Sequence, residues 1–284
     1  MNFRIGKLSY LNNLPMYYTL LRRHPPFTRE WTFVEGSPSQ LNAFIREGEI
    51  DLSVVSSIEY AKNFKSYFIL PNLSISSDGP VQSVLLFSWV PMEKLHEQPL
   101  LVSSASETSM ALMKIILTRR HLEPCYLRGK IPESGNEFEE FSKNFQGLLV
   151  IGDYALQLKE RSHFPFVYDL GEEWRKLTGL PFVFALWVVK RNIFFQRQEI
   201  VLQVLRALQE SRTYSLAHLD ELIAFIQKPA DVPDVTYIRY FQNLRYELTA
   251  RYQEGLKRYY HFLWKLGEIP YPVYDLTFVK EAES

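Results

Sequence analysis

The chain has 284 residues, of which 46% are hydrophobic and 23% charged, a composition typical of a folded globular protein. Lys plus Arg and Asp plus Glu are balanced at 32 each, so the formal net charge is zero and no global basic field would gather nucleic acid or an anionic membrane. The single cysteine, Cys125, excludes an intramolecular disulfide, and the lack of a signal-like apolar core at residues 1–9 or of any membrane-length apolar run leads us to expect a cytoplasmic protein.

The first third of the chain alternates short apolar runs with helical patterns. Strands are predicted at residues 3–5, 31–34 and 52–55. A helix that starts near Asn12 and Asn13 and runs to about residue 23 separates the first two strands. A second helix follows Ser37, with Gln40 completing a capping box and Gly48 ending the helix. This alternation of strands and helices predicts a parallel sheet.

The next third contains extended runs at residues 67–70, 73–75 and 81–87, with no room for helices between them. The alternation then restarts. Strands are predicted at residues 100–102, 148–151, 166–168 and 182–189, and helices at residues 109–121, 154–161 and 171–177. From about residue 194 the pattern is purely helical, and no internal repeat is visible.

This order predicts two α/β lobes. The first comprises residues 1–88 and the returning C-terminal helices of residues 186–284, and the second comprises residues 89–185. A chain that crosses twice between lobes makes a hinge with a ligand cleft beneath it. We therefore expect the two-lobed, periplasmic-binding-protein-like (type II) arrangement of solute-binding folds, with a helical C-terminal segment.

Polar residues gather at several predicted strand ends, where ligands collect in open α/β sheets. Asn12 and Asn13 follow the first strand, and either one can cap the helix while the other faces a ligand. Ser83 begins a strand after the turn residues Gly79 and Pro80, and taken alone it is equally explained as an ordinary strand hydroxyl.

Two further segments follow predicted strands of the second lobe. Residues 103–109 hold more hydroxyl groups, including Ser106, Thr108 and Ser109, than helix capping requires, which favours a carboxylate or phosphate site at a helix N-terminus. Asp153 follows the strand ending at Gly152, and we expect it to cap the next helix, since its charge would repel an anionic ligand unless it held a proton or a hydroxyl.

The sequence lacks the patterns of several common site types. None of the six histidines lies in these polar segments, and we find no Ser–His–Asp arrangement, metal-ligand spacing, Walker loop or GxGxxG loop. We therefore expect no metal and no cofactor, and a base other than an obvious histidine.

These segments together resemble the chorismate dehydratase family of the futalosine route to menaquinone. The matching stretches, in chain order, are Tyr10-Leu11-Asn12 with Leu14-Pro15, Gly36-Ser37-Pro38 with Leu41-Asn42, Val55-Ser56-Ser57-Ile58-Glu59-Tyr60, Gly79-Pro80-Val81-Gln82-Ser83-Val84, Ser106 with Thr108-Ser109, Ile151-Gly152-Asp153, Asp169-Leu170-Gly171-Glu172-Glu173-Trp174, and Thr178-Gly179-Leu180-Pro181-Phe182-Val183-Phe184-Ala185-Leu186-Trp187. The likeness covers about residues 3–190. Asn13 and residues 123–139 match no pattern, and the helical tail matches only in character.

The resemblance implies a cofactor-free hydro-lyase that converts chorismate to 3-[(1-carboxyvinyl)oxy]benzoate and water, with no nucleic-acid or membrane partner. It places Asn12 and Ser83 at the reacting edge, with the substrate's own enolpyruvyl carboxylate as the base. The residues expected to bind substrate are Ser56, Ser57, Ser106, Thr108, Ser109, Gly152 and Asp153.

Two alternatives stay open. One is a non-catalytic binding protein for an anionic metabolite, which the missing leader and lipidation cysteine disfavour. The other is 1,4-dihydroxy-6-naphthoate synthase, a sister enzyme of the same fold that is expected to use a histidine base.

Overall fold

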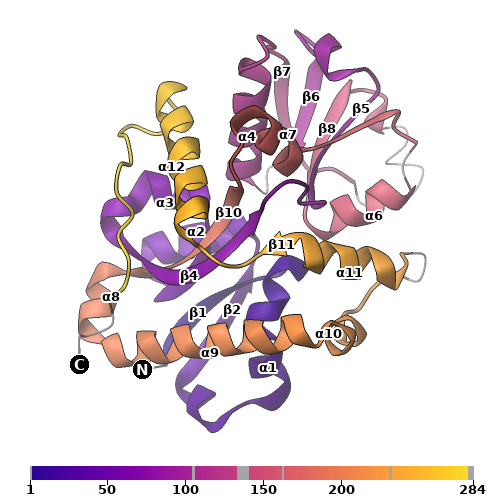
Figure 1. The fold of residues 1–284 in the computed structure, drawn as a ribbon. Coiled ribbons are helices and arrows are strands. Elements are labelled where there is room, and N and C mark those ends of the chain that lie inside the picture. Colours follow the sequence, from indigo (N-terminus) through magenta and orange to yellow (C-terminus); the bar gives the residue numbers. More distant parts are fainter. Residues whose placement is uncertain (1, 104–105, 133–140, 162, 230–231, 281–284) are drawn as a thin grey trace.

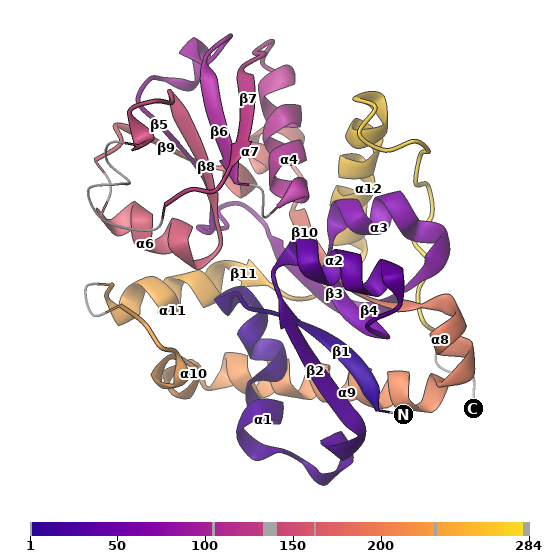
Figure 2. The ribbon, with the colours of Figure 1, turned by 180° about the vertical axis from the view of Figure 1, so that it is seen from behind.

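A computed structural model describes residues 2–103, 106–132, 141–161, 163–229 and 232–280. The strands form two separate sheets, one of six strands and one of five, and Figures 1 and 2 show them on opposite sides of the molecule's middle. The described strands are β1 (Phe3–Leu8), β2 (Trp31–Gly36), β3 (Leu52–Ser56), β4 (Tyr67–Ser77), β5 (Val84–Ser88), β6 (Pro99–Ser103), β7 (Cys125–Gly129), β8 (Gly147–Ile151), β9 (Phe166–Asp169), β10 (Phe182–Lys190) and β11 (Leu244–Arg245).

The six-stranded sheet has the order β11-β4-β10-β3-β1-β2, in which β2, β1 and β3 are parallel, as predicted. Its helices are η1 (Leu11–Asn13), α1 (Leu14–Arg23), α2 (Pro38–Glu47) and α3 (Ser57–Asn63). The predicted capping box of α2 is confirmed, because Ser37 Oγ accepts the Gln40 N–H while the Gln40 side chain accepts the Ser37 N–H. Helix α3 is not among the elements that the apolar pattern predicts.

The five-stranded sheet has the order β7-β6-β8-β5-β9, in which β7, β6 and β8 are parallel. The helices of this half are α4 (Glu107–Thr118), α6 (Asp153–Arg161) and α7 (Leu170–Thr178). Strand β7 is absent from the prediction because its exposed, polar-interrupted sequence lacks an apolar run.

Both sheets repeat one topology. In the first sheet the parallel strands lie in the order β2-β1-β3, and the antiparallel strand β10 lies next to β3. In the second sheet the parallel strands lie in the order β7-β6-β8, and the antiparallel strand β5 lies next to β8. The chain reaches both β10 and β5 directly after it crosses from the other half. The ends of β1 and β6 are therefore equivalent positions, as are the ends of β3 and β8. The amino-acid sequence shows no corresponding repeat.

The two crossings between the sheets lie at residues 78–83 and 179–181. The prediction assigned residues 84–88 to the first lobe and residues 182–185 to the second, but β5 pairs within the five-stranded sheet and β10 within the six-stranded sheet. The boundaries therefore fall several residues earlier than predicted. The extended run predicted at residues 81–87 includes the last residues of the crossing, so the sequence pattern alone does not mark the change of sheet.

The C-terminal segment is mostly helical, as predicted, but it also holds the two residues of β11 and, after its last helix, the non-helical residues 266–280, where Phe278 forms an isolated bridge with Ile69. Its helices are α8 (Arg191–Gln196), α9 (Gln198–Ala217), α10 (Leu219–Phe225), α11 (Asp234–Asn243) and α12 (Ala250–Lys265). Helix α9 packs along α1, and α12 packs on β10, so the segment returns to the first sheet (Figure 1). Within the described residues, no helix combines the length and hydrophobicity needed to cross a membrane.

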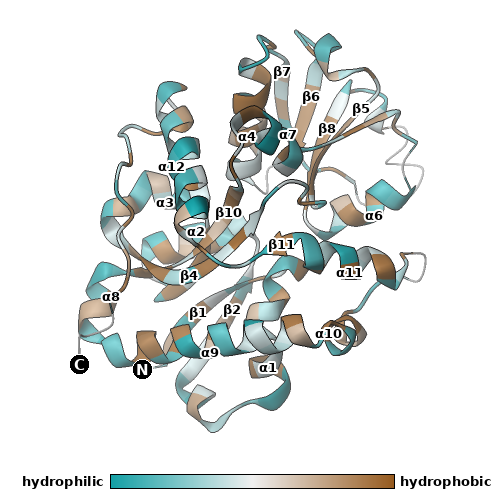
Figure 3. Ribbon diagram, in the orientation of Figure 1, coloured by the Kyte–Doolittle hydropathy of each residue, from teal (hydrophilic) through white to brown (hydrophobic). Residues whose placement is uncertain are grey.

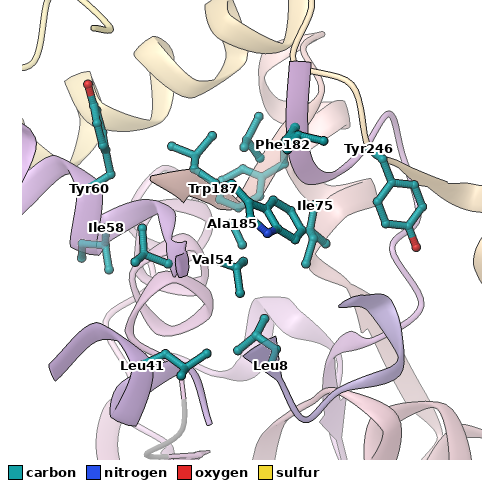
Figure 4. Packing of buried hydrophobic residues seen from close by; sticks show 14 of the residues in the cluster. Leu8, Leu41, Val54, Ile58, Tyr60, Ile75, Phe182, Ala185, Trp187 and Tyr246 are labelled. Atoms are coloured by element: carbon teal, nitrogen blue, oxygen red, sulfur yellow. The ribbon is translucent and has the colours of Figure 1, made fainter. Parts of the chain in front are cut away.

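One large hydrophobic core extends through both halves. It includes Val54 and Trp187 of the first sheet together with Leu86 and Leu149 of the second. Figure 4 shows Trp187 and Ala185 of β10 beside Val54 and Ile75 of the neighbouring strands. Helix α4 is buried along almost its whole length, and Figure 3 shows it as largely hydrophobic where α12 carries more hydrophilic positions.

Candidate active site

A cavity of about 60 Å³ lies between the two sheets, where the strand ends of both halves meet. Its polar lining residues are Tyr10, Asn12, Ser56, Ser83, Ser106 and Ser109. Apolar side chains, including Leu8, Val55, Ile75, Ile151 and Phe184, form much of the remaining wall. None of the described lining residues is charged, and none of the six histidines, all of which are described, is among them.

Asn12 and Ser83, the residues expected at the reacting edge, lie together at this cavity. The link between them is Tyr240 of α11, whose Oη donates to Ser83 Oγ over 3.1 Å and also interacts with the Asn12 side chain. Tyr240 is fully buried, and burial is the main cause that raises the pKa of its phenol well above the usual value.

Sequence reasoning missed Tyr240. Its helix buries Tyr237, Tyr240 and Phe241, a spacing that predicts a core face and carries no signal of a site. Only the fold brings this part of the tail to the end of β1.

Neither asparagine caps α1, contrary to the capping interpretation. Asn13 occupies the N-cap position but makes no side-chain cap, and its Nδ2 instead donates to the Leu8 carbonyl over 3.4 Å. Asn12 lies within η1, and its Oδ1 is buried with no hydrogen-bond partner in the part of the chain that is described. An unpaired buried acceptor on a residue that lines a cavity is a candidate partner for a donor on a ligand.

Ser106 and Ser109 line the second side of the cavity at the N-terminus of α4. Ser106 Oγ accepts the Ser109 N–H over 3.2 Å and lies 2.9 Å from Ser109 Oγ. Thr108 is placed differently from the expectation, because its Oγ1 accepts the Ile58 N–H over 3.1 Å and the residue does not line the cavity. Thr108 therefore ties α4 to α3, and Ser106 and Ser109 are the described hydroxyl residues of this segment that line the cavity.

The predicted pair Ser56 and Ser57 divides in the same way. Ser56 lines the cavity, where its Oγ accepts from Asn42 Nδ2 over 2.9 Å. Ser57 is fully buried, and its Oγ donates to the Val183 carbonyl over 2.6 Å. Ser56 thus faces the ligand space, while Ser57 joins α3 to β10.

Gly152 brings the two halves into close contact. A β-carbon at Gly152 would lie 3.0 Å from the Tyr10 ring, and its φ of +71° is one that residues with side chains rarely adopt. The residue lines the cavity, and its N–H donates to the Ser83 carbonyl over 2.8 Å. Glycine at this position therefore allows Tyr10 to close over the cavity.

Asp153 spans the two halves. Its Oδ1 and Oδ2 lie 3.0 and 3.2 Å from the Leu11 N, which donates to them from the other side of the cleft. The capping interpretation accounts for neither contact. Burial raises the pKa of the Asp153 carboxyl from 3.8 to about 7, although the Leu11 hydrogen bond acts in the opposite direction. The residue therefore holds a proton for part of the time near neutral pH, the condition under which an anionic ligand tolerates it.

Asp169 fixes the crossing that carries Ser83. Its Oδ1 accepts from the N–H groups of Val81 and Gly171 over 3.0 and 2.9 Å, and its Oδ2 accepts from Gln82 N over 2.6 Å. Gln82 has a φ of +65°, so the backbone just before Ser83 is held in a conformation that side chains disfavour. Asp169 thus sets the approach of Ser83 to the cavity.

The electrostatic field in the cavity comes from helix ends. Pro38 begins α2, Ser106 caps α4 and Gly152 directly precedes α6, and all three residues line the cavity. Helix N-termini carry partial positive charge and unpaired N–H groups. The site therefore favours a ligand with carboxylate groups and an apolar body, and it does so without a lysine or arginine in its described lining.

Solved structures share this architecture. A protein from Archaeoglobus fulgidus matches with a TM-score of 0.73 at 16% identity, covering 94% of this chain and 98% of that one. The alkanesulfonate-binding protein from Xanthomonas axonopodis pv. citri, solved with MOPS, matches with a TM-score of 0.70 at 15% identity, covering 96% of this chain and 95% of that one. These likenesses confirm the predicted periplasmic-binding-protein-like α/β fold.

Sequence comparison then identifies the family. The model of the menaquinone biosynthesis family matches residues 3–265, and the chain belongs to that family. A Thermus thermophilus protein named chorismate dehydratase is 31% identical over 266 residues, which covers 88% of this chain and 93% of the relative. A Campylobacter jejuni protein of the same name is 28% identical over 257 residues, which covers 89% of this chain and 94% of the relative.

Proposed function

We propose that this protein is a cytoplasmic chorismate dehydratase, a hydro-lyase that forms 3-[(1-carboxyvinyl)oxy]benzoate and water for menaquinone biosynthesis. The observation that carries the proposal is a single cavity with Asn12 and Ser83 on one side and the N-terminus of α4 on the other, in a member of this family. The similarity to two proteins named chorismate dehydratase along most of the chain supports the same assignment.

The anchor for the substrate's ring carboxylate is the N-terminus of α4, with Ser106 and Ser109. Removal of the proton at C3 leaves charge that spreads through the ring into this carboxylate. A helix N-terminus and two hydroxyl groups stabilise the charge where it accumulates, with no cationic side chain required. The apolar residues of the wall suit the ring, because they exclude water from it.

All atoms of the two products, the benzoate and water, come from chorismate. The enolpyruvyl carboxylate takes the proton from C3, the C3–H electron pair becomes part of the aromatic ring, and the bond from C4 to its hydroxyl oxygen breaks. The departing hydroxide combines with the abstracted proton to give water. Asn12 and Ser83 hold this edge of the ring, so the site needs no histidine base.

Incubation of the purified protein with chorismate tests the proposal, with the product followed by its aromatic absorbance and by mass spectrometry. We expect an aromatic product lighter than chorismate by one water. Binding without turnover would favour the binding-protein alternative, and neither binding nor turnover would favour the naphthoate synthase. Ser83→Ala gives the matched inactive control, since it removes one cavity hydroxyl and leaves the backbone contact to Gly152 in place.

A further inference from the structure

Tyr240 connects Asn12 and Ser83, the two residues of the reacting edge, from a position outside the cavity lining. It is fully buried on α11, it does not line the cavity, and its hydroxyl contacts both Asn12 and Ser83. Two other fully buried phenols, Tyr246 and Tyr260, have hydroxyls with no partner among the described residues, and Tyr17 and Tyr259 donate to backbone carbonyls away from Asn12 and Ser83. Tyr240 thus differs from these phenols in that its hydroxyl partner, Ser83, is a residue that lines the cavity.

The hydrogen bonds of this network have a fixed direction. Tyr240 has one hydroxyl hydrogen, which it donates to Ser83 Oγ over 3.1 Å. Toward Asn12 it can only accept, so the Asn12 amide nitrogen is the donor and Asn12 Oδ1 is left without a partner, as observed. The hydrogen of Ser83 is in turn free to point into the cavity. Burial keeps the Tyr240 phenol protonated, so this direction does not reverse near neutral pH.

We infer that Tyr240 is a positioning residue that makes Ser83 a hydrogen-bond donor and Asn12 Oδ1 an acceptor toward the substrate. The inference rests on the proposed function and names which part of the substrate this edge recognises. An adjacent donor and acceptor match a single hydroxyl group, which gives its hydrogen to Asn12 and receives one from Ser83. Chorismate carries one hydroxyl, at C4, and this is the group that leaves.

The arrangement explains how neutral residues assist the elimination. As the bond from C4 to oxygen breaks, negative charge grows on the departing oxygen, and the Ser83 hydroxyl donates to it more strongly. Tyr240 supports that donation because its own hydrogen bond to Ser83 Oγ polarises the serine hydroxyl. Without Tyr240, Ser83 can rotate to accept from other groups, and Asn12 can turn its nitrogen into the cavity.

The test compares Tyr240→Phe with Tyr60→Phe. Tyr60 is also a fully buried phenol with one hydrogen bond, accepted from Thr277 N over 3.2 Å, and it lies outside the cavity lining. Tyr240→Phe should lower kcat for chorismate about 10-fold with KM and product affinity changed less than about 3-fold. Tyr60→Phe should leave both parameters unchanged. Equal kcat values for the two variants would overturn the inference while leaving the proposed function intact.

Two further measurements separate positioning from general destabilisation. In a Ser83→Ala background, Tyr240→Phe should cost less than about 3-fold in kcat, because Tyr240 acts partly through Ser83; full additivity would contradict the inference. Crystal structures of the wild type and of Tyr240→Phe test it without turnover. Ser83 and Asn12 should each occupy one rotamer in the wild type and several in the variant. Unchanged rotamers, or a wild-type Ser83 that does not contact Tyr240, would overturn it even if chorismate proves not to be the substrate.

Discussion

After β1 the chain enters the short helix η1, whose Asn12 lines the cavity and has a buried, unpaired Oδ1, whereas after β6, the equivalent strand of the second sheet, it enters the long helix α4 with Ser106 as its cap. The first strand end offers an amide held by Tyr240, and the second offers hydroxyls and helix N–H groups. One topology thus supplies two kinds of site. In the proposed function, the first holds the neutral group that reacts, and the second holds the ring carboxylate.

The largest expected effect on kcat comes from substitutions at Asn12 and Ser83, on the side of the cavity where we propose that the reaction occurs. Asn12→Ala and Ser83→Ala should each lower kcat by roughly 10²–10³-fold, with little change in affinity for a benzoate product analogue, because these groups act mainly as charge develops. Steady-state kinetics and calorimetric binding of the analogue measure the two quantities, with circular dichroism to check folding. Normal turnover by both variants would contradict the assignment, and a loss of affinity alone would make them binding residues.

At the N-terminus of α4, the proposed carboxylate anchor, a substitution should mainly weaken ligand binding. Ser109→Ala removes a hydroxyl that faces the cavity, so chorismate and the product analogue should both bind more weakly, by roughly 1.5–3 kcal/mol for a hydrogen bond to a charged group. Thr108→Val is the control on the same helix. Its hydroxyl serves Ile58 N, so we expect lower stability and unchanged affinity. If Thr108→Val weakens binding as much as Ser109→Ala, Thr108 has the ligand role that the sequence suggested.

The sequence predicted the first sheet more completely than the site. Capping residues, glycine and apolar alternation are local signals, and they located β1, β2, β3 and α2. The hydroxyl-rich segment also pointed to α4 as a place for an anion. Local signals do not show which of two adjacent residues faces inward, so Ser57 and Thr108 were grouped with Ser56 and Ser109. The pairing of Tyr240 with Ser83 depends on contacts 157 residues apart, which no local pattern encodes.

An intermediate effect is expected at the crossing between the sides. Asp169→Asn keeps the shape of the side chain but removes its charge and replaces one accepting oxygen with an NH2 group, which cannot accept from the backbone N–H that it faces at Gln82 or at Val81 and Gly171. The free energy of unfolding should fall by roughly 1–2 kcal/mol, and kcat should fall because Ser83 follows directly after Gln82. Chemical denaturation and kinetics measure these changes. Reduced stability with full kcat would show that Asp169 supports the fold without placing Ser83.

The smallest expected effect concerns the contact that bridges the two sides, between Asp153 and the Leu11 N–H. The pKa of Asp153 is raised from 3.8 to about 7, so between these values the folded protein binds more protons at this group than the unfolded chain does. Stability contributed by this group is therefore greatest at low pH, falls as the pH rises through this window, and levels off above about 7.

Asp153→Asn isolates that dependence, because an amide oxygen still accepts from Leu11 but carries no charge at any pH. The wild type should lose stability relative to the variant as the pH rises from about 4 to about 7, a trend that thermal unfolding of the two proteins in matched buffers would measure. Other titrating groups contribute equally to both proteins and cancel in the difference. A difference in Tm that is constant across this range would mean that Asp153 is ionised throughout, and the bridge would then bring a permanent negative charge to the side of the cavity meant for an anion.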